Sequence, residues 1–228
     1  MIEKICPKCR IPMPGDKCIN SQCGHVTVTS STIYWCKSCN IPIFDKQCSK
    51  CGREADYIAT DLRPVFPEEK LLLALLLGKE PLYYQNKSVW YGSNVYIVDG
   101  KKIRLPISKI NKWPLEKIKS IKEAYDINKK DIDYSYFNNI ANAFVEANKD
   151  RYNYITQEAV NYVQRYQERF TIEDMMVSFS GGKDSTVTSH IVNRALGTNK
   201  VLHVFGDTTL EFSYTIEYRK RFNKNEES

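Results

Sequence analysis

The chain has 228 residues, enough for one or two domains at about 100–200 residues per domain. Its hydrophobic and charged fractions, 42% and 26%, are those of a folded protein and exclude a disordered chain. The formal net charge is +6, with lysines scattered from end to end. Such a balance suits polyanionic partners such as nucleotides or nucleic acid, and it is equally the default of a lysine-rich proteome.

Neither a leader nor a membrane span is expected. The N-terminus, Met1-Ile2-Glu3-Lys4, lacks the charged-then-apolar pattern of a signal peptide. The apolar run from Leu71 to Leu77 is far shorter than the ~20 residues that cross a bilayer. We therefore expect a cytoplasmic protein without membrane contact.

The N-terminal part contains an internal repeat of 30 residues that holds every cysteine of the chain. Ile11-Pro12 recurs as Ile41-Pro42, and the last cysteine of the first copy is displaced by two residues. Such self-similarity indicates two copies of one small unit, which we assign to residues 1–28 and 29–54. The eight cysteines are Cys6, Cys9, Cys18 and Cys23 in the first copy, and Cys36, Cys39, Cys48 and Cys51 in the second.

The cysteine spacing predicts one metal ion in each copy. Two pairs of closely spaced thiolates complete a tetrahedral four-thiolate zinc site, and units this small usually need a metal to fold. In a cytosolic chain, metal is favoured over disulfides. Iron in an iron–sulfur or rubredoxin-type site uses the same ligands and stays open. His25 is interpreted as a bystander because Arg53 stands at its place in the repeat. With every ligand position filled, both sites are expected to be structural.

The middle of the chain divides into three further segments. Residues 52–67 are interpreted as a linker containing Pro64 and Pro67. Residues 67–112 are predicted to form a small α+β module: a helix from Pro67 to Gly78, then strands with a hairpin turn at Asp99-Gly100. Residues 113–170 are predicted to form a helical connector. Its apolar stripes, such as Leu115, Ile118 and Ile121, are interpreted as core.

The last segment, 171–228, has the pattern of a βαβ unit. An apolar strand at 175–179 is followed by a glycine turn, a helix to about Ala195 and a second apolar strand at 201–205. Parallel strands joined by a right-handed crossover are expected. His203 is interpreted as a core residue and His190 as a surface one.

The turn between that strand and helix predicts a site for an anion. Consecutive glycines let the backbone approach a phosphate closely, and the first N–H groups of the helix point toward it. Serine hydroxyls and a lysine add donors and charge. The motif is neither of the common phosphate-loop patterns GxxxxGK[ST] and GxGxxG. It consists of Ser180, Gly181, Gly182, Lys183, Asp184 and Ser185.

This string, following an apolar strand, resembles the PP-loop of the phosphoadenosine phosphosulfate (PAPS) reductase family, within the PP-loop ATP pyrophosphatase superfamily. A second match is Asp207-Thr208-Thr209-Leu210-Glu211-Phe212, which is similar to the family's Asp-Thr-x-x-x-Phe segment. The resemblance covers about residues 171–222. It implies an α/β parallel-sheet domain of the adenine nucleotide alpha hydrolase-like kind. It also implies that residues 180–185 hold the phosphate or sulfate end of an adenine nucleotide, with Asp207 binding the nucleotide or Mg²⁺.

Two departures from the family lead to alternatives. Only two strands of the parallel sheet are recognisable, so we expect an incomplete domain. The reductases use a late cysteine as nucleophile, and no cysteine follows Cys51.

The first hypothesis is reduction of PAPS or adenosine phosphosulfate (APS) to sulfite with a thiol electron donor. The second is an ATP pyrophosphatase that adenylates a nucleic acid for sulfur transfer. The third is a non-catalytic binding protein whose zinc modules recruit a nucleic acid or a protein.

Overall fold

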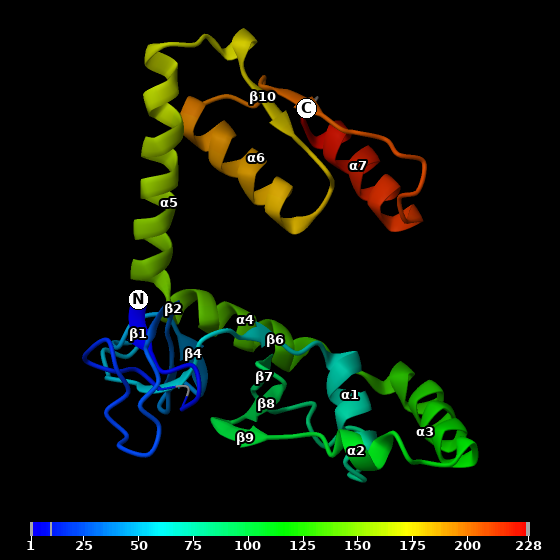
Figure 1. The fold of residues 1–228 in the computed structure, drawn as a ribbon. Helices are drawn as coiled ribbons and strands as arrows, with labels where there is room; N and C mark the ends of the chain where they lie inside the picture. Colours follow the sequence, from blue (N-terminus) through cyan, green and yellow to red (C-terminus); the bar gives the residue numbers. More distant parts are fainter. Residues whose placement is uncertain (1, 10, 227–228) are drawn as a thin grey trace. The chain divides into compact units, whose positions relative to one another are not determined.

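The computed structural model describes residues 2–9 and 11–226, and the chain divides into two compact units, 1–151 and 152–228 (Figure 1). The boundary falls within one helix, α5 (Lys149–Gln164). Both units mix helices and strands, as the α/β pattern predicts. In the described residues, no helix is long and apolar enough to cross a bilayer.

The first cysteine repeat is held by a short antiparallel pair of strands. Strand β1 (Ile2–Ile5) pairs with β2 (Val28–Ser31), and the cysteines lie on the loops between them. The small buried cluster here consists of Cys6, Met13 and Cys18. So few apolar groups cannot offset the chain entropy of folding, which is why this copy depends on its thiols.

The second repeat is built on the three-stranded sheet β4-β3-β5: β3 (Ile33–Cys36) lies between β4 (Ile41–Ile43) and β5 (Asp56–Ala59). Strand β5 corrects the linker prediction for residues 52–67. Strand β6 (Arg63–Pro64) lies in the same stretch and pairs with a further sheet. These strands are two to four residues long, too short for an alternating pattern to be recognisable.

The predicted helix and hairpin strands are present in residues 67–103, and β6, outside the predicted module, joins their sheet. Strands β7 (Val89–Gly92), β8 (Val95–Val98) and β9 (Lys101–Ile103) form an antiparallel sheet in the order β6-β7-β8-β9. Asp99 and Gly100 both have positive φ, 49° and 79°, as a two-residue hairpin turn of this twist requires. Helix α1 (Pro67–Leu76) packs Leu73 and Ala74 on this sheet.

The second repeat and the four-stranded sheet share a core. Ile33 and Trp35 from β3 cluster with Trp90 from β7 and Ile97 from β8. Phe144, from helix α4 (Ser135–Ala147), lies with its ring centroid 5.0 Å from that of Trp90. The metal module is therefore fixed to the sheet by aromatic packing.

One apolar stripe is not core. Helix α3 (Leu115–Asn128) has no buried residue, and Leu115 and Ile118 are 65% and 50% exposed. Its apolar side chains line an open groove of about 470 Å³ with α1 and the short helix α2 (Ile107–Ile110). The interpretation of this stripe as core was wrong because a helical period reports an apolar face, not what covers it.

Unit 152–228 contains the predicted βαβ arrangement. Strand β10 (Met176–Ser178) pairs in parallel with β11 (Leu202–Val204), and α6 (Lys183–Leu196) connects them. Gly197 ends α6 with φ 66°. Helix α7 (Ser213–Glu226), not predicted as an element, follows.

Both helices cover the same face of this two-stranded sheet. His203 on β11 is within 2.8 Å of the Ser189 hydroxyl of α6, between Nε2 and Oγ, and its ring lies 5.5 Å from that of Phe222 on α7. Because strands alternate their side chains, the neighbours of His203 face the other way. Met176 and Leu202 on that opposite face are 66% and 63% exposed. The domain is therefore an incomplete parallel-sheet domain, since parallel sheets are ordinarily covered on both faces.

Candidate functional site

The two four-cysteine groups are assembled as the spacing predicts. In each, the four sulfur atoms lie within 4.8 Å of one another. The paired distances are 3.6 Å for Cys6 to Cys23, 3.7 Å for Cys9 to Cys18, 3.5 Å for Cys36 to Cys51 and 3.8 Å for Cys39 to Cys48. A disulfide would require about 2.05 Å.

These distances fit a tetrahedral zinc ion. With Zn–S bonds of about 2.3 Å, the edge of a regular tetrahedron of sulfurs is roughly 3.8 Å. Both clusters can therefore hold a metal ion without rearrangement. His25 is outside the cluster, with Nδ1 3.4 Å from the sulfur of Cys23 and 2.8 Å from the carbonyl oxygen of Cys23.

The cysteine thiols within one cluster have different pKa values. The backbone N–H of Cys9 donates to the sulfur of Cys6 at 3.3 Å, which lowers the pKa of Cys6 to about 6. Hydrogen bonding to Cys23 and Cys18 raises the pKa of Cys9 to about 12. In the second cluster, the backbone near Arg53 lowers the pKa of Cys51 to about 7, while burial raises that of Cys39. Four thiolates this close need a dication to compensate their charge.

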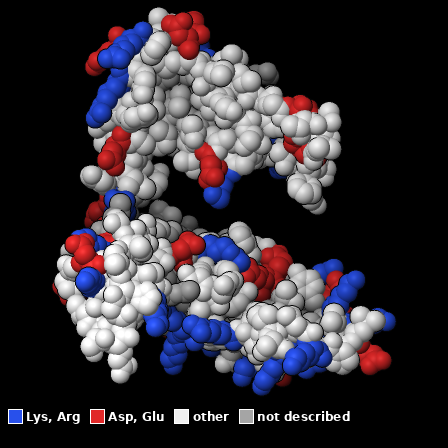
Figure 2. Space-filling model, viewed as in Figure 1, with Lys and Arg blue, Asp and Glu red and all other residues white. Residues whose placement is uncertain are grey.

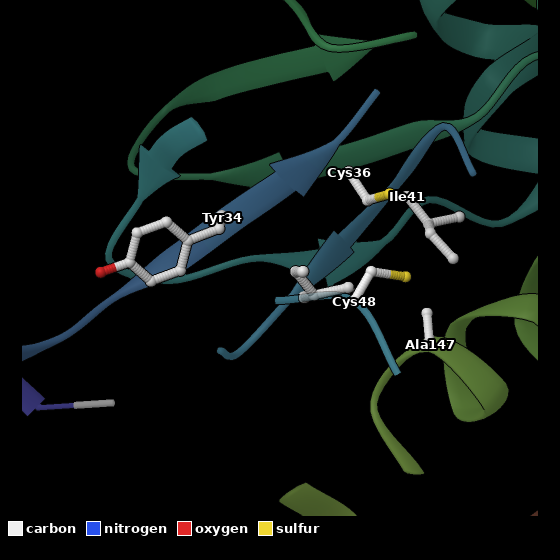
Figure 3. Close-up of a cluster of buried hydrophobic side chains, with 6 residues drawn as sticks. Tyr34, Cys36, Ile41, Cys48 and Ala147 are labelled. Carbon is white, nitrogen blue, oxygen red and sulfur yellow. The ribbon is translucent and has the colours of Figure 1, made fainter. Parts of the chain in front are cut away.

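Residues of helix α4 pack against the second cluster. Ala147 is buried against Cys48 and Ile41, and Figure 3 shows its side chain pointing from the helix toward the cluster. The backbone N–H of Ser49 donates to the Ala147 carbonyl at 3.0 Å. This docking was not recognisable from the cysteine spacing, because α4 lies about a hundred residues further along the chain.

The predicted phosphate loop leaves the carboxyl end of β10 and enters α6. Gly181 has φ 75°, and a Cβ built on it would lie 3.1 Å from the Thr215 methyl group of α7. A side chain at this position is therefore disfavoured both by the backbone and by the neighbouring helix. The first turn of α6 has no side-chain cap, so its N–H groups stay available to an anion.

The serines of the loop hold its shape from within. The backbone N–H of Ser180 donates to Ser185 Oγ at 3.2 Å, and Ser185 Oγ donates to the Gly182 carbonyl at 3.0 Å. Lys183 lies with Nζ 2.6 Å from the Asp184 carboxylate, and both side chains are nearly fully exposed. A loop with serine hydroxyls and one lysine, paired with its neighbouring aspartate, is thus open to solvent at the end of the sheet.

The second matched segment follows the neighbouring strand. Because β10 and β11 are parallel, Ser180 and Asp207 both come after the carboxyl ends of their strands, at one edge of the sheet. Asp207 accepts the Thr209 N–H at 2.9 Å and pairs with Arg219 of α7 at 3.2 Å. Arg219 also lies over the Phe205 ring at 4.6 Å. This pairing was not predicted from the sequence.

Comparison with known proteins bears on this unit. Residues 174–227 match the sequence model of the phosphoadenosine phosphosulfate reductase domain. No solved structure matches the chain.

Two curated relatives are uncharacterised proteins of Methanocaldococcus jannaschii. The chain is 34% identical to MJ0973 over 83 residues, which are 36% of this chain and 20% of that protein. It is 35% identical to MJ0066 over 109 residues, which are 45% of this chain and 22% of that protein. The chain thus spans about a fifth of the length of the curated relatives that it matches.

The match includes the loop at residues 180–185 and Asp207, and it supports a nucleotide-binding function of the PAPS-reductase kind. Behind two four-cysteine modules that can hold metal ions, residues 174–227 thus carry a match to the phosphoadenosine phosphosulfate reductase domain.

Proposed function

We propose that residues 180–185 bind the phosphate or sulfate end of an adenine sulfonucleotide, PAPS or APS, as part of an enzyme that reduces it to sulfite. The observation that carries the proposal is the exposed Gly181-Gly182 turn between β10 and the uncapped N-terminus of α6, within the family match. Asp207, at the same edge of the sheet, would contact the nucleotide or a Mg²⁺ ion bound with it. We place the reaction in the cytoplasm, where thiols stay reduced.

The proposed reaction consumes two thiols. A thiolate attacks the sulfur of the sulfonucleotide, and the sulfur–oxygen bond to the phosphate breaks, releasing AMP from APS or adenosine bisphosphate from PAPS. A second thiolate then attacks the first thiol's sulfur, so that a disulfide forms and sulfite leaves. All eight cysteines of this sequence lie in the two clusters. We therefore assign a structural zinc ion to each cluster, and we assign both reacting thiols to groups outside these 228 residues.

Titration calorimetry of the full chain with APS, PAPS and ATP tests the binding step. We expect a sulfonucleotide to bind, and Lys183→Ala to weaken binding about tenfold, the effect of losing one charge-assisted contact. Lys200→Ala, an exposed lysine outside the loop, is the matched control and should bind as the wild type does.

Assays of product formation, with a dithiol as the electron donor, distinguish the reductase from the two alternative functions. Sulfite together with AMP or adenosine bisphosphate supports the reductase. AMP and pyrophosphate from ATP, with no sulfite from either sulfonucleotide, would replace it by an adenylating pyrophosphatase. Binding without any turnover, even with a thiol donor present, would favour a nucleotide-binding protein that is not a catalyst.

A further inference from the structure

The positive charge of the chain is concentrated in one segment, contrary to the expectation of an even spread. Residues 101–122 contain eight lysines and arginines and a single acid, Glu116, a net charge of +7. The whole chain carries +6, so the other 206 residues together carry −1. A lysine-rich composition spreads charge over the whole surface and does not account for this segment.

The structure exposes all eight cations of this segment on the surface of unit 1–151. Lys101, Lys102 and Arg104 lie on and just after β9, and all three are exposed. The chain then passes through α2 into α3. The exposed lysines of this second part are Lys109, Lys112, Lys117, Lys119 and Lys122. Figure 2 shows Lys and Arg gathered along this edge, over β9, α2 and α3. We call residues 101–122 the basic strip.

In the part of the chain that the structure describes, the cations of the basic strip lack ion pairs, although Lys122 acts electrostatically on Asp126. Among the described residues, none of its eight cations forms an ion pair with an acid. Lys117 lies over the Trp113 ring at 4.1 Å, which leaves its charge uncompensated. Elsewhere in the same unit, cations such as Lys37, Lys46 and Lys50 are paired with carboxylates. Unpaired like charges repel one another, so a polyanion that neutralises them gains binding free energy.

We propose that the basic strip binds the phosphate backbone of a nucleic acid, independently of the nucleotide loop and without reading sequence. Eight cations along β9, α2 and α3 offer several contacts to the phosphates of a phosphodiester chain, and contacts of this kind position a strand without specifying bases.

An anionic membrane fits the surface less well. The apolar side chains of α3 that would enter a bilayer face a groove shared with Glu68 and Glu69. Those carboxylates would be drawn toward the anionic lipid head groups together with the apolar side chains, which is unfavourable.

The test compares two variants of the full chain that remove equal charge. The strip variant carries Lys101→Gln, Lys102→Gln, Lys109→Gln and Lys112→Gln. The control variant carries Lys8→Gln, Lys17→Gln, Lys200→Gln and Lys220→Gln, which are exposed lysines outside the strip. Circular dichroism and bound zinc are measured on both, so that any loss of binding is assigned to charge and not to unfolding.

Binding of a labelled single-stranded RNA, with duplex RNA and duplex DNA as further arms, is followed by fluorescence anisotropy across a salt series. We expect the strip variant to lose at least tenfold in affinity and the control less than threefold. The slope of log K against log salt should fall by about 0.7 for each phosphate contact removed from a single strand. RNA and DNA of different sequence should bind alike.

Four outcomes would overturn the proposal. They are no binding by the wild type, equal losses in both variants, preferential binding to phosphatidylserine vesicles, and competition by polyglutamate as effective as that by RNA. Because APS binding is measured separately on the same two variants, failure here is distinguishable from failure of the nucleotide loop.

Discussion

The side-chain oxygen Oδ1 of Asn148 accepts a hydrogen bond from the backbone N–H of Phe44 at 2.8 Å, joining the end of α4 to the second metal module. The amide nitrogen of the same side chain donates to the carbonyls of Pro42 at 3.2 Å and Phe144 at 2.8 Å. Asn148 is only 6% exposed, so its side-chain amide is satisfied by these protein groups in place of water.

Asn148→Ala is therefore expected to destabilise the zinc-loaded chain by about 1–3 kcal/mol, because it removes the three side-chain hydrogen bonds that join α4 to the second metal module. Urea unfolding followed by tryptophan fluorescence measures this. Asn139→Ala, at an exposed position of the same helix, should change the unfolding free energy by less than about 0.5 kcal/mol. Equal effects of the two substitutions would show that the bridge contributes nothing.

The metal clusters predict about two zinc ions per chain. Cys23→Ser should lower the zinc content to about one, since hard serine oxygen is a poor substitute for a thiolate. His25→Ala should retain both ions because its ring is outside the cluster. Inductively coupled plasma mass spectrometry on purified protein gives the count. Loss of an ion from His25→Ala would make the histidine a ligand, and iron in place of zinc would change the assignment of the metal.

Two glycines with similar backbone strain allow loop function to be separated from stability. Gly181 and Gly197 have φ 75° and 66°, so alanine at either should cost about 1 kcal/mol or more. Only Gly181 lies in the phosphate loop and beside Thr215. We expect Gly181→Ala to abolish APS binding and Gly197→Ala to preserve it, both measured by calorimetry. Binding retained by Gly181→Ala would remove the loop from the site.

Lys70 gives a prediction for pH dependence. It is 3% exposed, its Nζ donates to the Lys87 carbonyl at 2.7 Å, and burial lowers its pKa from 10.5 to about 8. Between pH 8 and 10.5 the unfolded chain therefore binds a proton that the folded chain has lost. Stability attributable to this group should then rise with pH across that range, by up to about 1.4 kcal/mol per pH unit.

The measurement is the unfolding free energy of the wild type minus that of Lys70→Met at each pH. The subtraction cancels the titration of all groups that the two proteins share. This difference should shift in favour of the wild type as pH increases from 8 toward 10.5. A difference that stays constant with pH would mean that Lys70 titrates alike in both states.

The local elements and the candidate ligands were predictable because their signals are local. Four cysteines within eighteen residues must lie close together, and Asp99-Gly100 allows hardly any other connection between two strands. The strand–glycine–helix pattern around Gly181 and Gly182 likewise specifies a loop at the end of a strand. In each case the chain between the relevant residues is too short to place them elsewhere.

Only the tertiary structure decided what covers each face. It placed Ala147 and Asn148 against the second metal module and left the apolar face of α3 open. It also brought Arg219 to Asp207, and it placed the basic residues of 101–122 along β9, α2 and α3, where they find no acidic partners among the described residues. Burial and charge pairing depend on residues far apart in the sequence. The hydrophobic effect that packs such residues together is non-directional, so a single segment does not specify which partner covers its apolar face.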